Sequence, residues 1–183
     1  MRWIFLALGL ALAPACATEA QTPLTAEQLL DGLAGDWRGA LGYRDYQSNQ
    51  LFELPVVTNI RLADGGHATI QTSRFDEGNR PDVYIVSVSG FDSESGLYET
   101  AGFRAGRAMS VSREAVSVAE ARDAEHWTIV FTERGMDDDR AADIRITLTR
   151  DGDQTLARKE VDYLADPTVN FEFRNQTRLT RVR

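Results

Sequence analysis

Short runs in which apolar and polar residues alternate fill most of the chain after residue 35. The clearest is 144–149, Ile-Arg-Ile-Thr-Leu-Thr, and the run 51–62 alternates in the same way. Because successive side chains of a β-strand point to opposite sides of a sheet, this alternation predicts strands with one buried face. Turn residues such as Asp64-Gly65-Gly66 separate the runs. The pattern predicts an all-β protein, an antiparallel up-and-down barrel of about eight to ten strands.

One short helix is predicted ahead of the strands, within residues 22–34. Thr25 is a suitable N-cap, Gln28 follows it at capping-box spacing, and Gly35 is expected to end the helix. The helix should lie across one end of the barrel, where its apolar stripe would be buried. That stripe consists of Leu29, Leu30 and Leu33.

The run 33–46, entered through Gly35-Asp36-Trp37, predicts the first strand, with Trp37 on its inner face. Glycines at 39 and 42 favour a bent strand, as at a barrel corner. The Gly35-x-Trp37 pair, preceded by a short helix and followed by strands, resembles the calycin superfamily of lipocalin-like and fatty-acid-binding-protein-like barrels. The resemblance implies that Trp37 plugs the closed end and that a basic residue near the last strand packs across it. Arg178 and Arg181 are the two candidates for that residue.

The stretch 37–42, Trp-Arg-Gly-Ala-Leu-Gly, also resembles the nitrobindin-like branch of this group, which holds haem. That resemblance implies a ligating His late in the barrel, and no His follows His126. We interpret His67 and His126 as surface groups. Asp137-Asp138-Asp139 lacks the spaced oxygen ligands of a calcium loop and is interpreted as a solvated hairpin tip. We therefore expect neither a metal nor an organic cofactor.

Motifs of enzymes are missing from the sequence. It contains no G-x-S-x-G elbow, no phosphate-binding glycine loop and no H-E-x-x-H. Glu160 and Asp162 share a strand face with Arg158, which predicts either a polar cluster inside the barrel or an ion-pair ladder outside it. Neither arrangement identifies an acid and a base, so a barrel enzyme of isomerase or cyclase type is the third hypothesis.

The first 20 residues have the layout of a secretory signal peptide. Arg2 precedes an apolar run over 4–13, and small residues follow. Cys16 is the only cysteine, which excludes an intramolecular disulfide, and Ala13-Pro14-Ala15-Cys16 resembles a bacterial lipobox. Lipidation of Cys16 and ordinary cleavage nearby both stay open. We expect export to the periplasm or the medium, with membrane attachment only through a lipid on Cys16.

The charge of the chain limits the classes of partner it can bind, and its length limits the number of domains. The formal net charge is −8, and the basic residues are scattered among acidic ones. Nucleic-acid binding depends on clustered Lys and Arg, so nucleic acid is not an expected partner. Residues 21–183 are enough for one domain with a sizeable core, and we expect a single barrel domain there.

Aromatic residues on the predicted strands suggest a function. A closed barrel of about ten strands is too wide for side chains alone to fill, so an internal cavity is expected, with a filled core as the alternative. We therefore expect a binding protein for a small hydrophobic or amphipathic ligand of fatty-acid size. A cell-envelope scaffold without a ligand is the alternative. The residues expected at the ligand are Tyr43, Asp45, Tyr46, Arg61, Phe131 and Phe173.

Overall fold

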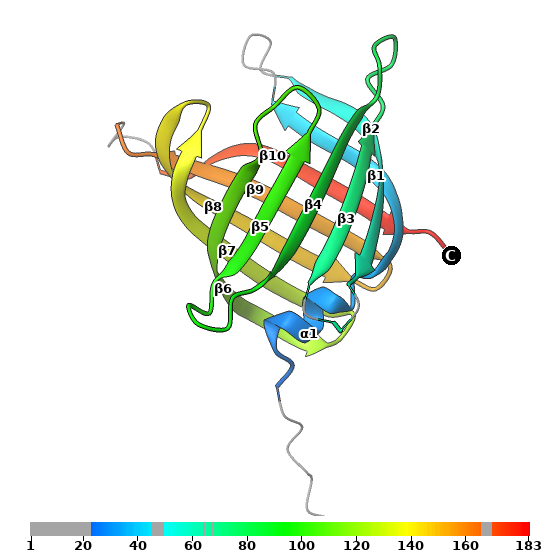
Figure 1. Cartoon of the computed structure of the whole chain (residues 1–183), viewed down its shortest axis with the longest axis vertical. Coiled ribbons are helices and arrows are strands. Elements are labelled where there is room, and N and C mark those ends of the chain that lie inside the picture. Colours follow the sequence, from blue (N-terminus) through cyan, green and yellow to red (C-terminus); the bar gives the residue numbers. More distant parts are fainter. Residues whose placement is uncertain (1–22, 45–49, 64, 67, 166–169) are drawn as a thin grey trace, which may run out of the picture.

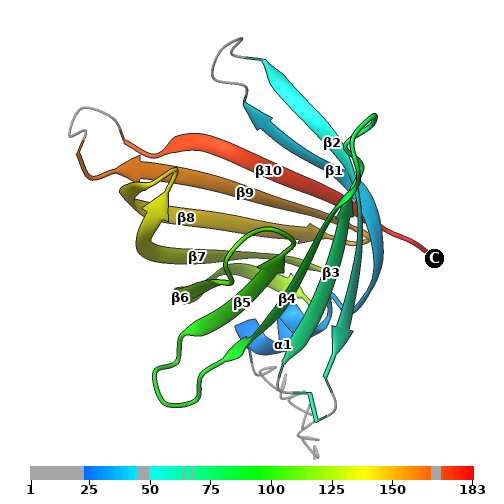
Figure 2. The same cartoon turned by 45° about the horizontal axis from the view of Figure 1, so that its top comes forward.

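The computed structural model describes residues 23–44, 50–63, 65–66, 68–165 and 170–183. Each strand pairs antiparallel with the next, and the first also pairs with the last, so the sheet closes into a ten-stranded barrel (Figures 1 and 2). This confirms the predicted fold. The elements are α1 (Ala26–Asp31), β1 (Gly35–Arg44), β2 (Leu51–Leu62), β3 (Thr69–Phe75), β4 (Val83–Phe91), β5 (Tyr98–Arg104), β6 (Ser110–Asp123), β7 (His126–Asp137), β8 (Arg140–Asp151), β9 (Gln154–Tyr163) and β10 (Glu172–Arg181).

The helix α1 lies at one end of the barrel (Figure 1). The predicted capping box is present: Thr25 Oγ1 accepts from the Gln28 backbone N–H at 3.2 Å, and Gln28 Oε1 accepts from the Thr25 N–H at 3.0 Å. The predicted C-terminus at Gly35 is wrong, because Gly32 caps the helix and Gly35 begins β1. A Cβ at Gly35 would lie 2.9 Å from Arg181 Nη1. Gly35 therefore makes room for a side chain of β10.

The largest hydrophobic cluster fills the end of the barrel next to α1. Burying one large apolar side chain contributes about 1.5–3 kcal/mol, so this cluster holds the helix against the sheet. Its buried members are Leu29, Leu30, Leu33, Trp37, Ile60, Trp127, Ile129 and Phe131.

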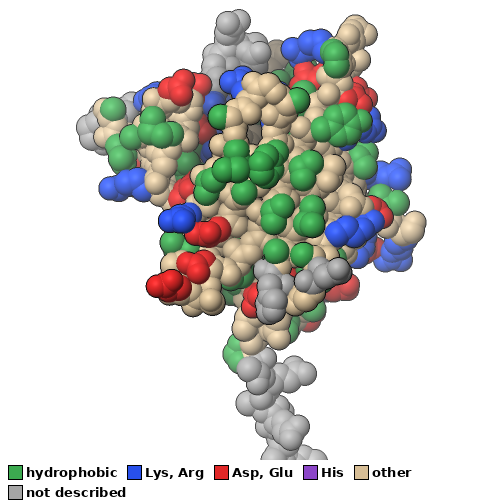
Figure 3. All heavy atoms as spheres, in the orientation of Figure 1, with side chains coloured by type: hydrophobic (Ala, Val, Ile, Leu, Met, Phe, Trp, Pro, Cys, Tyr) green, Lys and Arg blue, Asp and Glu red, His purple; other side chains and the backbone are tan. Residues whose placement is uncertain are grey.

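The outer wall of the barrel over β2 to β6 exposes apolar side chains (Figure 3). The strand register places Ile70 beside Val88, Val88 beside Ala101 and Ala101 beside Val111, so that these residues form one row. We call this surface the outer apolar face. Its exposed members are Val57, Ile70, Tyr84, Val88, Phe103 and Val111. Within the described ranges, no helix is long and apolar enough to cross a membrane.

Candidate functional site: the barrel interior

The barrel interior contains a cavity of about 190 Å³ beside Trp37. It lies between the α1 end and the middle of the barrel, and its wall is mixed in character. Thr58 and Ser73, both buried, share a hydrogen bond of 2.9 Å on this wall. The lining residues are Leu33, Trp37, Val56, Thr58, Ile60, Gln71, Ser73, Phe75, Thr155, Ala157, Thr177 and Leu179.

Trp37 is one of the residues that line this cavity. Its side chain is completely buried, and Nε1 donates to the Leu33 carbonyl at 2.8 Å. The Arg181 guanidinium lies 4.8 Å from the centre of the Trp37 ring and donates to the Gly32 carbonyl at 2.8 Å. Arg178, the other candidate, instead forms an ion pair with Glu53 on the outer surface. Of the two basic residues, Arg181 is the one that meets the indole.

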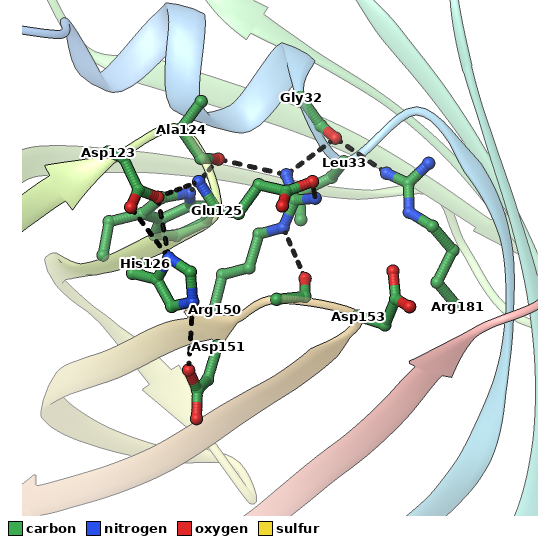
Figure 4. A network of polar contacts seen from close by, with 12 residues as sticks. Gly32, Leu33, Asp123, Ala124, Glu125, His126, Arg150, Asp151, Asp153 and Arg181 are labelled. Carbon is green, nitrogen blue, oxygen red and sulfur yellow. Dashed lines mark hydrogen bonds and ion pairs between the residues drawn. The ribbon is translucent and has the colours of Figure 1, made fainter.

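Arg150 on β8 ties α1 to two turns of the barrel (Figure 4). Its side chain is only 4% exposed. Its guanidinium donates to the carbonyls of Gly32 at 3.0 Å, Ala124 at 3.2 Å and Gly152 at 3.0 Å. It also donates to the Glu125 carboxylate at 3.2 Å. The Gly32 carbonyl thus accepts from both Arg150 and Arg181, so the end of α1 is held by β8 and β10.

His126 belongs to the same end of the barrel. Its Nδ1 lies 2.8 Å from Asp123, and its Nε2 lies 3.5 Å from Asp151 (Figure 4). The imidazole therefore bridges the turn between β6 and β7 and the end of β8. These contacts fit a structural role.

A charged cluster lies on the inner face of the strands nearer the opposite end. Asp137 is 8% exposed and accepts from Lys159 Nζ at 2.7 Å, Tyr163 Oη at 2.9 Å and Arg174 Nε at 2.8 Å. Burial and the neighbouring Asp137 charge raise the pKa of Tyr163 to about 12. Interpreting Asp137 as part of a solvated tip was therefore wrong. The two residues after it do form an exposed turn, with positive φ angles of 51° and 57°.

Glu114 on β6 is a second charged residue of the inner face. It is 8% exposed and pairs across the sheet with Tyr98, whose ring lies 5.6 Å from that of Phe131 in the apolar core. Burial raises the pKa of Glu114 from 4.5 to about 7; the charge of Glu133 adds to this shift and Lys159 opposes it. Sequence reasoning missed Glu114, although Val116 two residues later indicates an inward-facing position.

The residues predicted at the ligand are divided between the two faces. Tyr43 is on the inner face, with its ring 5.4 Å from Phe52, and Phe131 is in the buried core. Arg61 is exposed on the outer surface and pairs with Asp36 at 3.2 Å, so it does not face the barrel interior, where the ligand is expected. Asp45, Tyr46 and Cys16 lie outside the described residues.

Phe173 is on the outer surface, and its predicted place in the lumen is wrong. A register shift between Phe173 and Asn175 inserts an extra residue into β10, so Phe173 lies beside Glu160. Arg158 is 5.0 Å from the Phe173 ring. Glu160 also pairs with Arg145 at 2.9 Å and Arg158 at 3.2 Å, which makes this group an outer ion-pair ladder rather than an interior cluster.

Comparisons with known proteins bear on the fold. The sequence matches no protein-family model and no curated protein. Among solved structures, the crystal structure of Rv2717c from M. tuberculosis aligns with 88% of this chain and 100% of its own, with a TM-score of 0.59 and 16% identity. A protein of unknown function from the DUF3598 family of Nostoc punctiforme aligns with 87% of this chain and 100% of its own, with a TM-score of 0.27 and 6% identity. The first similarity supports the barrel fold.

Proposed function

We propose that the barrel binds a small amphipathic molecule in its interior. The observation that carries this proposal is the cavity of about 190 Å³ beside Trp37. Apolar residues of the α1 end form one side of the interior, and the Glu114 and Asp137 groups supply charge farther along. A molecule with one apolar part and one polar part would match both regions.

The cavity volume favours a ligand smaller than a fatty acid. An apolar protein cavity of about 150 Å³ accommodates benzene, whereas pockets for drug-sized ligands span about 300–1,000 Å³. A cavity of about 190 Å³ therefore suits a single ring with a short side chain. The signal-like start of the chain supports a place of action outside the cytoplasm, which is part of the same proposal.

Isothermal titration calorimetry with phenethyl alcohol tests the binding proposal. Ala157 lines the cavity, so Ala157→Phe should fill it and weaken binding at least about tenfold. Leu156→Phe is the matched control, because Leu156 is the residue before Ala157 on β9 and is exposed on the outer surface. Saturable binding by the wild type and Leu156→Phe, but not Ala157→Phe, supports a carrier. No binding by the wild type, or equal binding by Ala157→Phe, contradicts it. Thermal melts of both variants check that they are folded.

A further inference from the structure

Glu114 lies where the apolar core meets the charged interior. On one side it has Tyr98, Phe131 and Val116, which belong to or pack against the core cluster. On the other side lies Glu133 of β7, the residue after Thr132, which pairs with Ala115. The charge of Glu133 raises the pKa of Glu114, and the charge of Lys159 of β9 lowers it. Within the described residues, no hydrogen-bond donor contacts the Glu114 carboxylate. A carboxylate so buried normally has one, because leaving it unpaired is costly.

The charges of the inner face do not balance around Glu114. Lys159, whose charge acts on Glu114, binds Asp137 at 2.7 Å, and Asp137 also binds Arg174 at 2.8 Å. Glu133 likewise has no hydrogen bond or ion pair in the described part of the chain. Glu114 and Glu133 therefore face the interior without a bound cation among the described residues, whereas Asp137 binds both Lys159 and Arg174. The interior beside Glu114 is short of positive charge.

We infer that the polar group of the ligand is a protonated amine that binds Glu114, assisted by the negative charge of Glu133. This inference rests on the proposed function. An ammonium group supplies charge-assisted hydrogen bonds to a carboxylate, and these are roughly twice as strong as bonds between neutral groups. A carboxylate ligand would be repelled by the two glutamates.

The inner face of β9 leads from the cavity to Lys159. Thr155 and Ala157 line the cavity, and Lys159 is the next residue on the same face. The positive charge of Lys159 lowers the pKa of Glu114, against the larger effect of burial. The apolar part of the ligand would lie in the cavity beside Trp37, and its ammonium would extend along β9 toward Glu114.

Binding of an amine to this position should depend on pH. Glu114 is faced by Tyr98 of β5, Glu133 of β7 and Lys159 of β9, and its pKa is raised to about 7. The amine pairs with the ionised carboxylate, so below pH 7 binding must first remove a proton. The affinity should therefore fall by up to about tenfold for each pH unit below that point and level off above it.

Three ligands that share a phenethyl framework test the inference: phenethylamine, phenethyl alcohol and hydrocinnamate. At about pH 8 the wild type should bind the amine at least about tenfold more tightly than the alcohol, and this preference should shrink at about pH 6. Glu114→Gln should remove the preference for the amine but leave the affinity for phenethyl alcohol unchanged. Glu120→Gln is the matched control, because it changes the same charge at a residue that is 68% exposed. Glu133→Gln should weaken the preference and gives a second variant if Glu114→Gln does not fold.

The outcomes separate this inference from the proposed function. Equal affinity for amine and alcohol, or an amine preference that survives in folded Glu114→Gln, overturns the inference while the lumen still binds a ligand. Tighter binding of hydrocinnamate also overturns it. If none of the three ligands binds, both the inference and the proposed function fail.

Discussion

Glu114 couples the stability of the protein to pH. Its pKa is raised from 4.5 to about 7, so the folded protein holds the proton more tightly than the unfolded chain. A raised pKa of an acid favours folding while the group is protonated, and this contribution is lost as the pH rises through the folded pKa. The wild type should therefore lose stability from about pH 4.5 to about pH 7 through this group.

Glu114→Gln should remove this pH dependence, because glutamine stays neutral. The variant's advantage over the wild type in unfolding free energy should grow by about 2 kcal/mol as the pH rises from about 5 to about 8. Urea denaturation at the two pH values measures the change, and Glu120→Gln should show no such gain. A variant that is no more stable than the wild type at the higher pH would show that ionised Glu114 has a partner in solution.

At the scale of one residue, the sequence could predict Trp37 and could not predict the raised pKa of Glu114 or the outward position of Phe173. Trp37 follows a helix and a turn glycine, and this local pattern is visible in the chain. Phe173 reverses its face because of an irregularity in β10, and the alternation of residues does not mark that position. Glu114 owes its raised pKa to strands that are distant in sequence.

At the scale of the element, α1 depends on a buried arginine more than on its own six residues. A helix this short is not stable alone, so tertiary contacts must hold it. Its capping box was predictable because the two residues are three apart. Its C-terminus was not, because Gly32 is held by Arg150 and Arg181, which come from β8 and β10.

Arg150→Met should detach the end of α1. The substitution keeps a long side chain but leaves the carbonyls of Gly32, Ala124 and Gly152 without their donor, so we expect a loss of about 3 kcal/mol in unfolding free energy. Arg134→Met is the control; Arg134 pairs with Asp143 at an exposed position, and its loss should cost less than about 1 kcal/mol. Chemical denaturation compares the two. Equal losses would mean that Arg150 is not a special anchor.

At the scale of the whole molecule, the barrel was predictable and its interior was not. Alternation is a local signal repeated along the chain, so the all-β fold follows from it. Which face of a strand is inside is a separate question where both faces carry charge. On β9, Lys159 lies inside and Glu160 outside, although both are polar and adjacent. The charged interior could not be predicted for this reason.

The outer apolar face supports an alternative in which copies of the chain associate with one another. Apolar surface is usually buried when it is contiguous. Under this alternative, light scattering on a sizing column should show a mass above that of the monomer, and Val88→Lys with Phe103→Lys should restore the monomer. Leu156→Lys, on another part of the outer wall, is the control. A wild type that stays monomeric at high concentration would remove this support.

The pairing of β1 with β10 has a consequence for the order of folding. The other strand pairs join consecutive segments, whereas this one joins the two ends of the chain. Bringing distant segments together costs more loop entropy, so closure should be the slow, late step. Arg181 cannot reach Trp37 until the last strand has been synthesised. A growing chain would until then carry two unpaired strand edges, which is the state most exposed to pairing with other chains.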